Sequence, residues 1–320
     1  MTPVRNEAWV LRAFLEATSL WADYIVIADQ MSTDGSREIA REYPKVILID
    51  NNRKEMHMAA TRRLMFDAVR KIEGEKILFA LDADEFLSGD FVNTDDWKKI
   101  MDSSPDDSFC WRWMNLKSGD ATQYSTSQQY YWAVHESEDL WNGKFPDRCT
   151  HEWRLPWSPK ADETHKFFLN DFCSIHLARV NERRKCNKER FYQLSTIVGD
   201  AKESVVSMYR IYNSEEAVNY RILPKDAYRY YEEHGLDIWK FVDCTDEGQY
   251  YAEEALSYFE NGLNRYAMLN IWDSDWMGKN NIKDPRSWYH KLLHSYLQYT
   301  IPFSDRFPIK FVDKVLKQFV

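Results

Sequence analysis

The sequence predicts a doubly wound α/β fold with a mostly parallel sheet, followed by a mostly helical C-terminal region. Three apolar runs without polar alternation each end in acidic residues, and segments with helical spacing separate them. Strands that lack polar alternation are buried on both faces, and strands that alternate with helices form parallel βαβ units. The three apolar runs are 24–29, 45–50 and 76–85.

The first third of the chain alternates between extended and helical segments. It begins with a short extended piece at 2–5 and a helix over about 7–20, in which Leu11 and Phe14 follow helical spacing. Because few residues precede this helix, we expect that the natural chain starts upstream of Met1 or has been trimmed. The helices expected between the apolar runs are 32–43, which starts with Ser, Thr and Asp as capping residues, and 59–72.

The pattern changes at about residue 108. Two aromatic segments alternate like antiparallel strands, a loop-rich stretch follows, and a further strand ends near His176 before another helix. These segments are 108–116, 128–135, 140–157, 167–180 and 181–200. We therefore expect a catalytic domain over 1–200, with halves 1–90 and 91–200, and a helical extension over 201–320.

Composition and charge narrow the function classes. A net charge of −9 and a pI of about 5.5 argue against a general nucleic-acid-binding protein, which needs a basic surface. The five Cys form no CxxC pair, which favours reduced thiols in the cytoplasm over a disulfide framework or a zinc site. No apolar run approaches the roughly 18–20 residues that span a bilayer. We therefore expect a cytoplasmic protein.

Polar residues close each of the first strands. Arg5 and Asn6 follow the first extended piece, Asp29 ends the second, and Asp82 and Asp84 lie at the end of the third apolar run. Ligands of doubly wound sheets bind beyond the carboxyl ends of the strands. The topology therefore predicts that these side chains gather along one edge of the sheet and form one site.

Three motifs occur in order along residues 3–84. They are PVRNE, then S-T-D-G after the acid that ends the run 24–29, then D-A-D after a buried run. In this combination the sequence resembles the nucleotide-sugar-binding half of glycosyltransferase family 2, which has the GT-A fold. The resemblance is strong over about residues 1–90 and loose over 91–190. It implies transfer of a sugar from a nucleotide-diphospho-sugar to an acceptor hydroxyl.

The resemblance implies a divalent cation, Mn²⁺ or Mg²⁺, at the D-x-D acids. A hard cation takes oxygen ligands from both the carboxylates and the diphosphate, which would otherwise repel each other. Asp84 is implied as the direct ligand, and Asp82 as a group that lies nearer the ribose or reaches the cation through water. The alternative is a solvated turn with a helix-capping Asp. Glu85 either supports these acids or begins the next loop.

His176 is implied as a further ligand, because relatives with the GT-A fold complete the metal shell with a His well downstream of D-x-D. A neutral imidazole suits such a position beside carboxylate and phosphate oxygens. The alternative is a hydrogen-bonded His in the core.

The resemblance also assigns residues to the nucleotide. The PVRNE segment lies under the base and ribose, and Asp29, which ends the run 24–29, accepts from the base N–H. The chain has Arg62 and Arg63 where the family often has Arg-Asn, and Arg62 is the positional match. The alternatives are helix capping for Asn6 and Glu7 and a surface ion pair for the Arg. The nucleotide-sugar-binding residues implied are Pro3, Arg5, Asn6, Glu7, Asp29, Arg62 and Asp82.

A general base for the acceptor hydroxyl is expected after the D-x-D half. The stretch CTHEWRLPW resembles the H-E pair of relatives that glycosylate bacterial surface sugars, so Glu152 is the first candidate base. His151 would orient it, and Asp147 is the second candidate. Trp153 and Trp157 would stack on a sugar or pack the loop. The alternative is that these charges only belong to an ordered loop.

We therefore interpret the chain as a metal-dependent glycosyltransferase of the hexosyltransferase type. The family implies inversion and a role in bacterial surface polysaccharide or glycoconjugate synthesis. The alternatives are a nucleotidyltransferase and a non-catalytic nucleotide-sugar-binding module. A nucleotidyltransferase would usually carry a Gly-rich basic loop after the first strand, where this chain has PVRNE.

The segment 307–320 reads as a basic amphipathic helix. Its apolar residues follow one stripe, and Lys310, Lys314 and Lys317 lie elsewhere. Such a helix favours peripheral contact with an anionic membrane at its cytoplasmic face, which suits a saccharide or lipid-linked saccharide acceptor. The alternative is a terminal helix that docks on its own domain.

Overall fold

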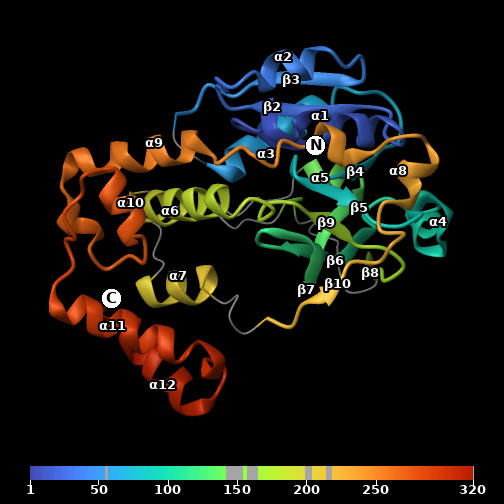
Figure 1. The fold of residues 1–320 in the computed structure, drawn as a ribbon. Helices are drawn as coiled ribbons and strands as arrows, with labels where there is room; N and C mark the ends of the chain where they lie inside the picture. Colours follow the sequence, from blue (N-terminus) through green and yellow to red (C-terminus); the bar gives the residue numbers. More distant parts are fainter. Residues whose placement is uncertain (55–56, 142–153, 157–164, 199–203, 214–217, 320) are drawn as a thin grey trace. The chain divides into compact units, whose positions relative to one another are not determined.

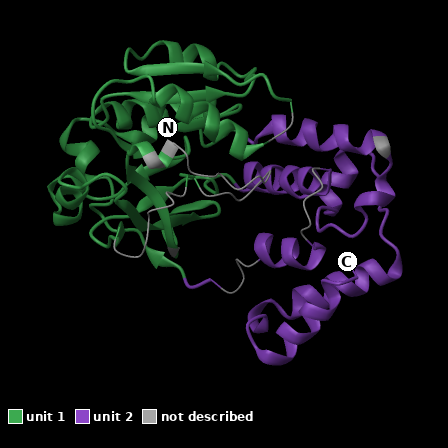
Figure 2. Ribbon diagram, turned by 180° about the vertical axis from the view of Figure 1, so that it is seen from behind, with its two compact units in different colours: residues 1–181, 220–246 green, residues 182–219, 247–320 purple. Residues whose placement is uncertain are grey.

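The structure is a computed structural model that describes residues 1–54, 57–141, 154–156, 165–198, 204–213 and 218–319. The chain forms two compact units, drawn in green and purple in Figure 2. Unit 1 comprises 1–181 and 220–246, and unit 2 comprises 182–219 and 247–320. Position 200, where the sequence predicts the end of the catalytic domain, falls within unit 2, and the segment 220–246 belongs to unit 1.

Unit 1 begins with a parallel sheet of three strands in the order β1-β2-β3 (Figure 1). The strands are β1 Thr2–Val4, β2 Ile25–Asp29 and β3 Val46–Asp50, and the helices after them are α1 Ala8–Ser19, α2 Ser36–Arg41 and α3 Met58–Val69. The register pairs Val4 with Asp29 and Asp29 with Asp50, so the carboxyl ends of these strands are level.

Strand β2 is buried along its whole length, which explains its unbroken apolar sequence. Ile25 and Ile27 belong to the hydrophobic cluster that contains α1. Val26 and Ala28 belong to a second cluster that contains the apolar side of α3. Alternate side chains therefore contact opposite helical layers, which confirms the α/β fold with helices on both faces.

The second sheet of unit 1 has seven strands in the order β10-β7-β6-β9-β5, with β4 paired to β7 and β8 paired to β6. Its strands are β4 Ile77–Phe79, β5 Glu85–Leu87, β6 Ser108–Lys117, β7 Asp120–His135, β8 Lys166–Phe168, β9 Ser174–His176 and β10 Arg221–Ile222. The antiparallel pair β6–β7 agrees with the alternating aromatic pattern of the sequence.

The apolar run 76–85 differs from the expectation of one parallel strand. It is split into β4 and β5, and β4 pairs antiparallel with β7. The strand is interrupted because the chain turns between Asp82 and Glu85, where Glu85 N donates to Asp82 O at 3.1 Å. The acids therefore lie on a connection between two short strands.

The core of unit 1 is rich in aromatic residues. The ring of Phe91, which is fully buried, lies within 5.0 Å of Trp97 and 4.7 Å of Tyr230 between centroids, and Trp21 and Phe172 surround it. This cluster links the sheet to the segment 220–246. The remaining elements of the unit are η1 Phe91–Asn93, α4 Asp95–Met101, α5 Glu138–Trp141, α8 Arg229–Glu233 and η4 Ile238–Phe241.

Unit 2 is helical in its described residues, and helices α6 and α9 pack together. Within the described part of the chain, no helix combines the length and apolar character that crossing a membrane requires. The elements of unit 2 are α6 Glu182–Val198, α7 Val205–Tyr212, α9 Gln249–Ser257, η5 Tyr258–Asn261, η6 Leu263–Tyr266, α10 Ser274–Lys279, α11 Trp288–Tyr299, η7 Ile301–Phe303 and α12 Phe307–Leu316.

Replacing Phe91 by Ala should lower the free energy of unfolding by about 3–5 kcal/mol, because it leaves a cavity among rigid aromatic rings. Urea denaturation followed by tryptophan fluorescence measures the change. Phe168→Ala is the control, because Phe168 is 55% exposed and the substitution should change the free energy by less than about 1 kcal/mol. Equal effects of the two substitutions would contradict this view of the core.

Candidate active site

Two acids, Asp82 and Asp84, lie on the connection between β4 and β5, and a third, Glu85, begins β5. Asp84 and Glu85 are buried, whereas the side chain of Asp82 is one-third exposed. The backbone N–H of Asp82 donates to Glu85 Oε2 at 2.8 Å, which closes the turn in both directions. Leu177 N donates to Asp84 O at 2.9 Å and ties the turn to the end of β9. The acids are therefore fixed by the backbone of two strands.

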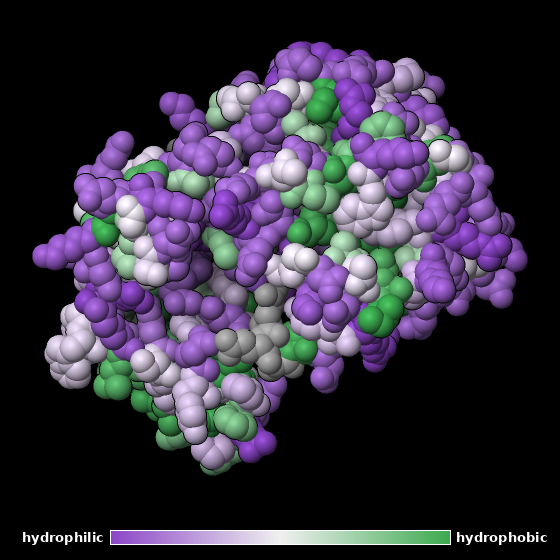
Figure 3. All heavy atoms as spheres, viewed as in Figure 1, coloured by the Kyte–Doolittle hydropathy of each residue, from purple (hydrophilic) through white to green (hydrophobic). Residues whose placement is uncertain are grey.

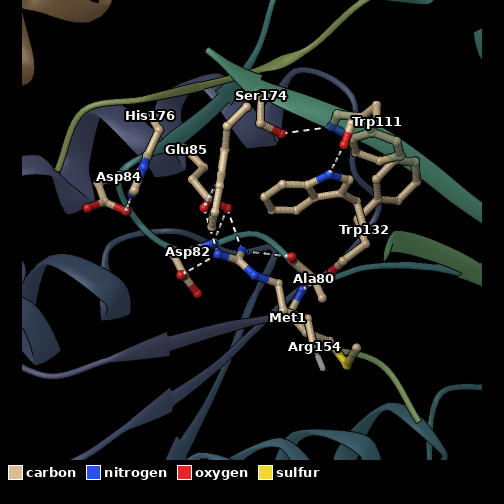
Figure 4. A network of polar contacts seen from close by, with 12 residues as sticks. Met1, Ala80, Asp82, Asp84, Glu85, Trp111, Trp132, Arg154, Ser174 and His176 are labelled. Atoms are coloured by element: carbon tan, nitrogen blue, oxygen red, sulfur yellow. Dashed lines mark hydrogen bonds and ion pairs between the residues drawn. The ribbon is translucent and has the colours of Figure 1, made fainter. Parts of the chain in front are cut away.

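Arg154 is the cation that faces this turn (Figure 4). Its Nη1 donates to Glu85 Oε2 at 2.6 Å and to the carbonyl oxygen of Ala80 at 3.2 Å. Its Nη2 donates to Asp82 Oδ2 and to Glu85 Oε1, both at 2.7 Å. The planar fork of a guanidinium matches two carboxylates in this way, which a Lys could not do. Arg154 therefore holds Asp82 and Glu85 together.

Aromatic rings enclose this ionic contact. The Arg154 Cζ lies 4.4 Å from the ring centroid of Trp132 and 5.3 Å from that of Trp113. The indole N–H of Trp113 also donates to Glu85 Oε1 at 2.8 Å. Rings at these positions exclude water and attract the guanidinium through their π faces. Little water reaches the contact, so the guanidinium and the carboxylates must satisfy each other through hydrogen bonds.

Burial determines the protonation of this pair. Burial raises the pKa of Glu85 to about 7, and this outweighs the opposing attraction of the Arg154 guanidinium, while the charge of Asp82 adds to the rise. Burial lowers the pKa of Arg154, but the charges of Asp82 and Glu85 outweigh it, so the net direction is upward. Arg154 therefore keeps its charge, and Glu85 lies close to its titration point at neutral pH.

Asp84 points away from Arg154 and toward His176 (Figure 4). The distance between Asp84 Oδ1 and His176 Nε2 is 3.7 Å. On the other side of the imidazole ring, His176 Nδ1 lies 2.9 Å from Asn115 Oδ1, an atom that can only accept a hydrogen bond. Nδ1 therefore carries a proton, and in the neutral imidazole the lone pair of Nε2 faces Asp84. The ring is fixed further by stacking on Trp113 at 5.0 Å.

Asp84, Glu85 and His176 form a group whose ligand atoms all lie within 4.8 Å of one another. Carboxylate oxygens suit Mn²⁺ and Mg²⁺, and an imidazole nitrogen is a common ligand of transition metals. Both Glu85 oxygens already accept from Arg154, and Oε1 accepts from Trp113 as well, so Asp84 and His176 are the better placed ligands. The donor set therefore fits a hard divalent cation between Asp84 and His176.

Arg62 and Arg63 point in different directions. Arg62 is buried in α3, with Nη2 3.9 Å from Asp82 Oδ1 and Nη1 donating to the Arg154 carbonyl oxygen at 3.3 Å. Arg63 is exposed. Arg62 therefore adds a second positive charge beside Asp82, and its role toward a nucleotide stays a prediction.

The PVRNE segment forms β1 and the start of α1. Asn6 has a left-handed backbone with φ 55°, and its Oδ1 accepts from Thr33 N at 2.7 Å. The Glu7 carboxylate accepts from the indole N–H of Trp9 at 2.6 Å. Both side chains therefore hold local structure in this conformation. Pro3 lies within β1, and Arg5 Nη1 donates to Lys54 O at 3.1 Å at the exposed side.

Asp29 ends β2 and is 1% exposed. Its Oδ2 accepts from Arg37 Nη1 at 2.7 Å and from Ser32 N at 3.2 Å. Its Oδ1 is buried and accepts no hydrogen bond within the described residues. A buried carboxylate oxygen without a donor is costly, so Asp29 is suited to accept a hydrogen bond from a ligand.

A separate cavity of about 420 Å³ opens near the amino ends of the strands. Met1, Phe14, Tyr24 and Ile77 are among its lining residues, and the wall is largely apolar. The acids Asp82, Asp84 and Glu85 do not belong to its described lining. Ligands of α/β sheets bind at the opposite, carboxyl ends, so this cavity is not the candidate active site.

The two candidate general bases, Asp147 and Glu152, lie outside the described residues, as do His151, Trp153 and Trp157. Sequence reasoning assigned no role to Arg154, Asn115 or Trp113. The available signal for Arg154 was charge, since three closely spaced acids beside a buried strand need a cation to be stable.

The comparisons with known proteins agree with the sequence motifs. The model of the family described as glycosyl transferase family 2 matches residues 1–152. This family has the GT-A fold, and the parallel sheet with helices on both faces is the corresponding part of the structure. No curated protein matches the chain.

Among solved structures, the crystal structure of HddC from Yersinia pseudotuberculosis matches with 13% sequence identity and a TM-score of 0.31. The match covers 52% of this chain and 78% of that chain. At this TM-score the likeness indicates neither a shared fold nor a shared activity.

Replacing Arg154 by Ala should destabilise unit 1 by about 3–5 kcal/mol, because it leaves the buried Glu85 and the partly exposed Asp82 without the cation that holds them. Arg154→Lys should recover only part of the loss, since Lys lacks the planar fork. Denaturant unfolding measures both variants. Arg12→Ala is the control, because Arg12 forms an exposed pair with Glu42 that should contribute less than about 1 kcal/mol. An Arg154→Ala variant as stable as the control would refute the role given to this pair.

Proposed function

We propose that the chain is a metal-dependent hexosyltransferase that uses a nucleotide-diphospho-sugar donor, because the model of glycosyl transferase family 2 matches residues 1–152. The family supports a glycosyltransferase with a nucleotide-sugar donor and a saccharide acceptor. Metal dependence is supported by one observation: His176 Nε2 lies 3.7 Å from Asp84 Oδ1, just after a buried strand.

Asp84 and His176 would hold Mn²⁺ or Mg²⁺. When bound, the cation would stabilise negative charge on the departing diphosphate. Asn115 supports this role because it fixes the His176 ring with Nε2 toward Asp84. Asp82 accepts from Arg154 and faces Arg62, so it would act on the ribose or through water rather than as a direct ligand.

The nucleotide would lie over the carboxyl ends of β1 and β2. The buried Oδ1 of Asp29 supports a hydrogen bond from the N–H edge of the base. Arg5 and Pro3 would contact the nucleotide from the exposed side of β1, and Arg62 would oppose the charge of the diphosphate. Asn6 and Glu7 would act through the shape of the loop, since their side chains accept from Thr33 and Trp9.

Glu152 would act as the general base that takes the proton of the acceptor hydroxyl, with Asp147 as the second candidate. The attack of that hydroxyl opposite the leaving diphosphate would invert the anomeric carbon. Arg154, two positions after Glu152 in the sequence, is held against Asp82 and Glu85.

We further propose a lipid-linked saccharide as the acceptor, in the synthesis of a bacterial surface polysaccharide or glycoconjugate at the cytoplasmic face of the membrane. The helical unit 2 supports this through the exposed apolar residues of α11 and α12.

Asp84→Asn should reduce turnover of the donor by about 10²-fold or more, because it removes a charged ligand of the cation. The assay is release of nucleoside diphosphate from a panel of UDP-, GDP- and TDP-linked hexoses, with Mn²⁺ and with EDTA. Asp67→Asn is the control, since Asp67 is exposed on α3 and should retain full activity.

Two results would refute this proposal. One is that no donor of the panel is hydrolysed, transferred or bound in a Mn²⁺-dependent manner by the wild-type protein. The other is that Asp84→Asn is as active as the wild type. Thermal shift with each donor and Mn²⁺ separates loss of binding from loss of turnover.

Glu152→Gln should lower kcat by about 10²- to 10⁴-fold while the KM for the donor stays constant, because the amide keeps the shape but cannot take a proton. Steady-state kinetics with the donor that the panel identifies measures both constants. Asp147→Asn, measured in parallel, should retain activity. If the loss follows Asp147 instead, the role of base passes to that residue.

A further inference from the structure

Helix α12 is attached to unit 2 through a polar residue. Asp313 is 7% exposed and accepts from Arg210 Nε at 2.9 Å, from Arg210 Nη2 at 3.1 Å and from Tyr296 OH at 3.0 Å. Arg210 also donates to Leu297 O at 2.7 Å and to Thr300 Oγ1 at 2.6 Å. This buried ion pair fixes which side of α12 faces the unit.

The apolar side of α12 therefore faces solvent. Two positions along a helix differ by about 200° around its axis, so Phe311 and Val315 lie opposite Asp313. Phe307 is 81% exposed and Phe311 is 60% exposed. An ordinary surface helix buries its apolar side and exposes its polar side. On helix α12 the inward side carries Asp313 and Leu316, whereas the large apolar side chains of Phe307 and Phe311 are exposed.

Helix α11 adds to the same kind of surface. Its inward residues are His290, His294 and Leu297, and Leu297 belongs to a cluster with Val206 and Tyr209 of α7. Its outward side carries large apolar residues that are 62–79% exposed. The exposed set on the two helices, here named the α11–α12 surface, is Trp288, Leu292, Tyr299, Phe307, Phe311 and Val315.

Figure 3 shows this region from the direction of Figure 1, with green and pale side chains gathered over the part of the chain where α12 lies. Single exposed apolar residues are normal on a protein, but a run of large ones on adjoining helices marks an interaction site.

Charge indicates what the α11–α12 surface binds. Residues 284–319 contain six Lys or Arg and three Asp, whereas the whole chain has a net charge of −9. Asp284 pairs with Arg286 and Lys291, Asp305 pairs with Lys310, and Asp313 pairs with Arg210. Lys314 and Lys317 are exposed, next to the apolar side of α12. The surface is therefore apolar and locally basic in an acidic protein.

We propose that the α11–α12 surface docks on the surface of an anionic lipid bilayer. Helices that lie in a bilayer interface combine large apolar and aromatic residues with flanking Lys and Arg. Trp288 and Tyr299 are residue types that favour the level of the headgroups. The contact is peripheral, and it would bring the chain to a lipid-linked acceptor. It concerns unit 2 alone and does not depend on the proposed transfer reaction.

Self-association fits the surface less well. A symmetric contact between two copies would place the same patch of each copy together. Lys314 and Lys317 of both copies would then lie in one contact, and like charges repel where water is excluded. An anionic bilayer supplies the opposite charge, so it complements both properties of the surface.

The test is cosedimentation with vesicles of phosphatidylcholine containing one third phosphatidylglycerol, compared with vesicles of phosphatidylcholine alone. No donor, acceptor or metal is added. The wild-type chain should bind the anionic vesicles, and added salt should weaken binding. Phe307→Ser with Phe311→Ser should weaken it by at least about tenfold, since two large apolar side chains are removed. Lys314→Glu with Lys317→Glu should weaken it by about tenfold or more.

Matched controls come from exposed residues of unit 1. Phe168→Ser with Ile222→Ser removes two exposed apolar side chains, and Lys71→Glu with Lys225→Glu makes the same change in net charge. Both controls should bind vesicles like the wild type. Quenching of tryptophan fluorescence by brominated lipid gives a second measurement on the wild-type chain. Trp288→Phe, a conservative change, should show less quenching, because it removes an exposed indole of the α11–α12 surface.

Three results would overturn the proposal. The wild-type chain does not sediment with anionic vesicles; the unit 1 controls lose as much binding as the α11–α12 variants; or the chain is a dimer that the Phe substitutions dissociate, without vesicle binding. Failure of the donor assay with intact vesicle binding would count against the transferase proposal alone.

Discussion

The contact of Arg154 with Asp82 and Glu85 is the interaction on which the candidate active site depends. Glu85 is fully buried, and a buried carboxyl group without a partner would cost several kcal/mol. The guanidinium stabilises it with two hydrogen bonds and links the turn between β4 and β5 to a segment 69 positions later. Trp113 and Trp132 enclose the contact and keep water out, so the position of the acids is fixed before any ligand binds.

The same contact divides the acids by role. Asp82 and Glu85 face Arg154, whereas Asp84 faces His176, so the three acids do not form one uniform cluster. With Arg62 and Arg154, the formal charge of the three acids and two arginines is −1 when Glu85 is ionised and 0 when it is protonated. A bound divalent cation would make the site positive and attractive to a diphosphate. Asn115 and Trp113 orient His176 for this arrangement without touching the cation.

Patterns that reflect burial could be predicted from the sequence, and contacts between distant segments could not. The unbroken apolar run of β2 and the amphipathic α1 and α3 follow from a layered α/β fold, and the D-x-D motif predicts Asp84 as a metal ligand, which stays a prediction. The run 76–85 was expected as one strand, but the turn at Asp82–Glu85 divides it and turns β4 toward β7. Arg154 was missed because its partners lie far away in the sequence. The sequence likewise could not predict which side of α12 faces outward, because Asp313 binds an Arg more than a hundred positions earlier.

The central claim is that Asp84 and His176 hold a divalent cation while Arg154 occupies the other two acids. Pulsed electron paramagnetic resonance of the Mn²⁺-loaded protein tests it directly, because a directly coordinated imidazole nitrogen couples to the Mn²⁺ electron spin. The account predicts a nitrogen coupling in the wild type that is lost in His176→Gln and retained in Arg12→Ala. Bound Mn²⁺ without nitrogen coupling, or coupling that persists in His176→Gln, would contradict it.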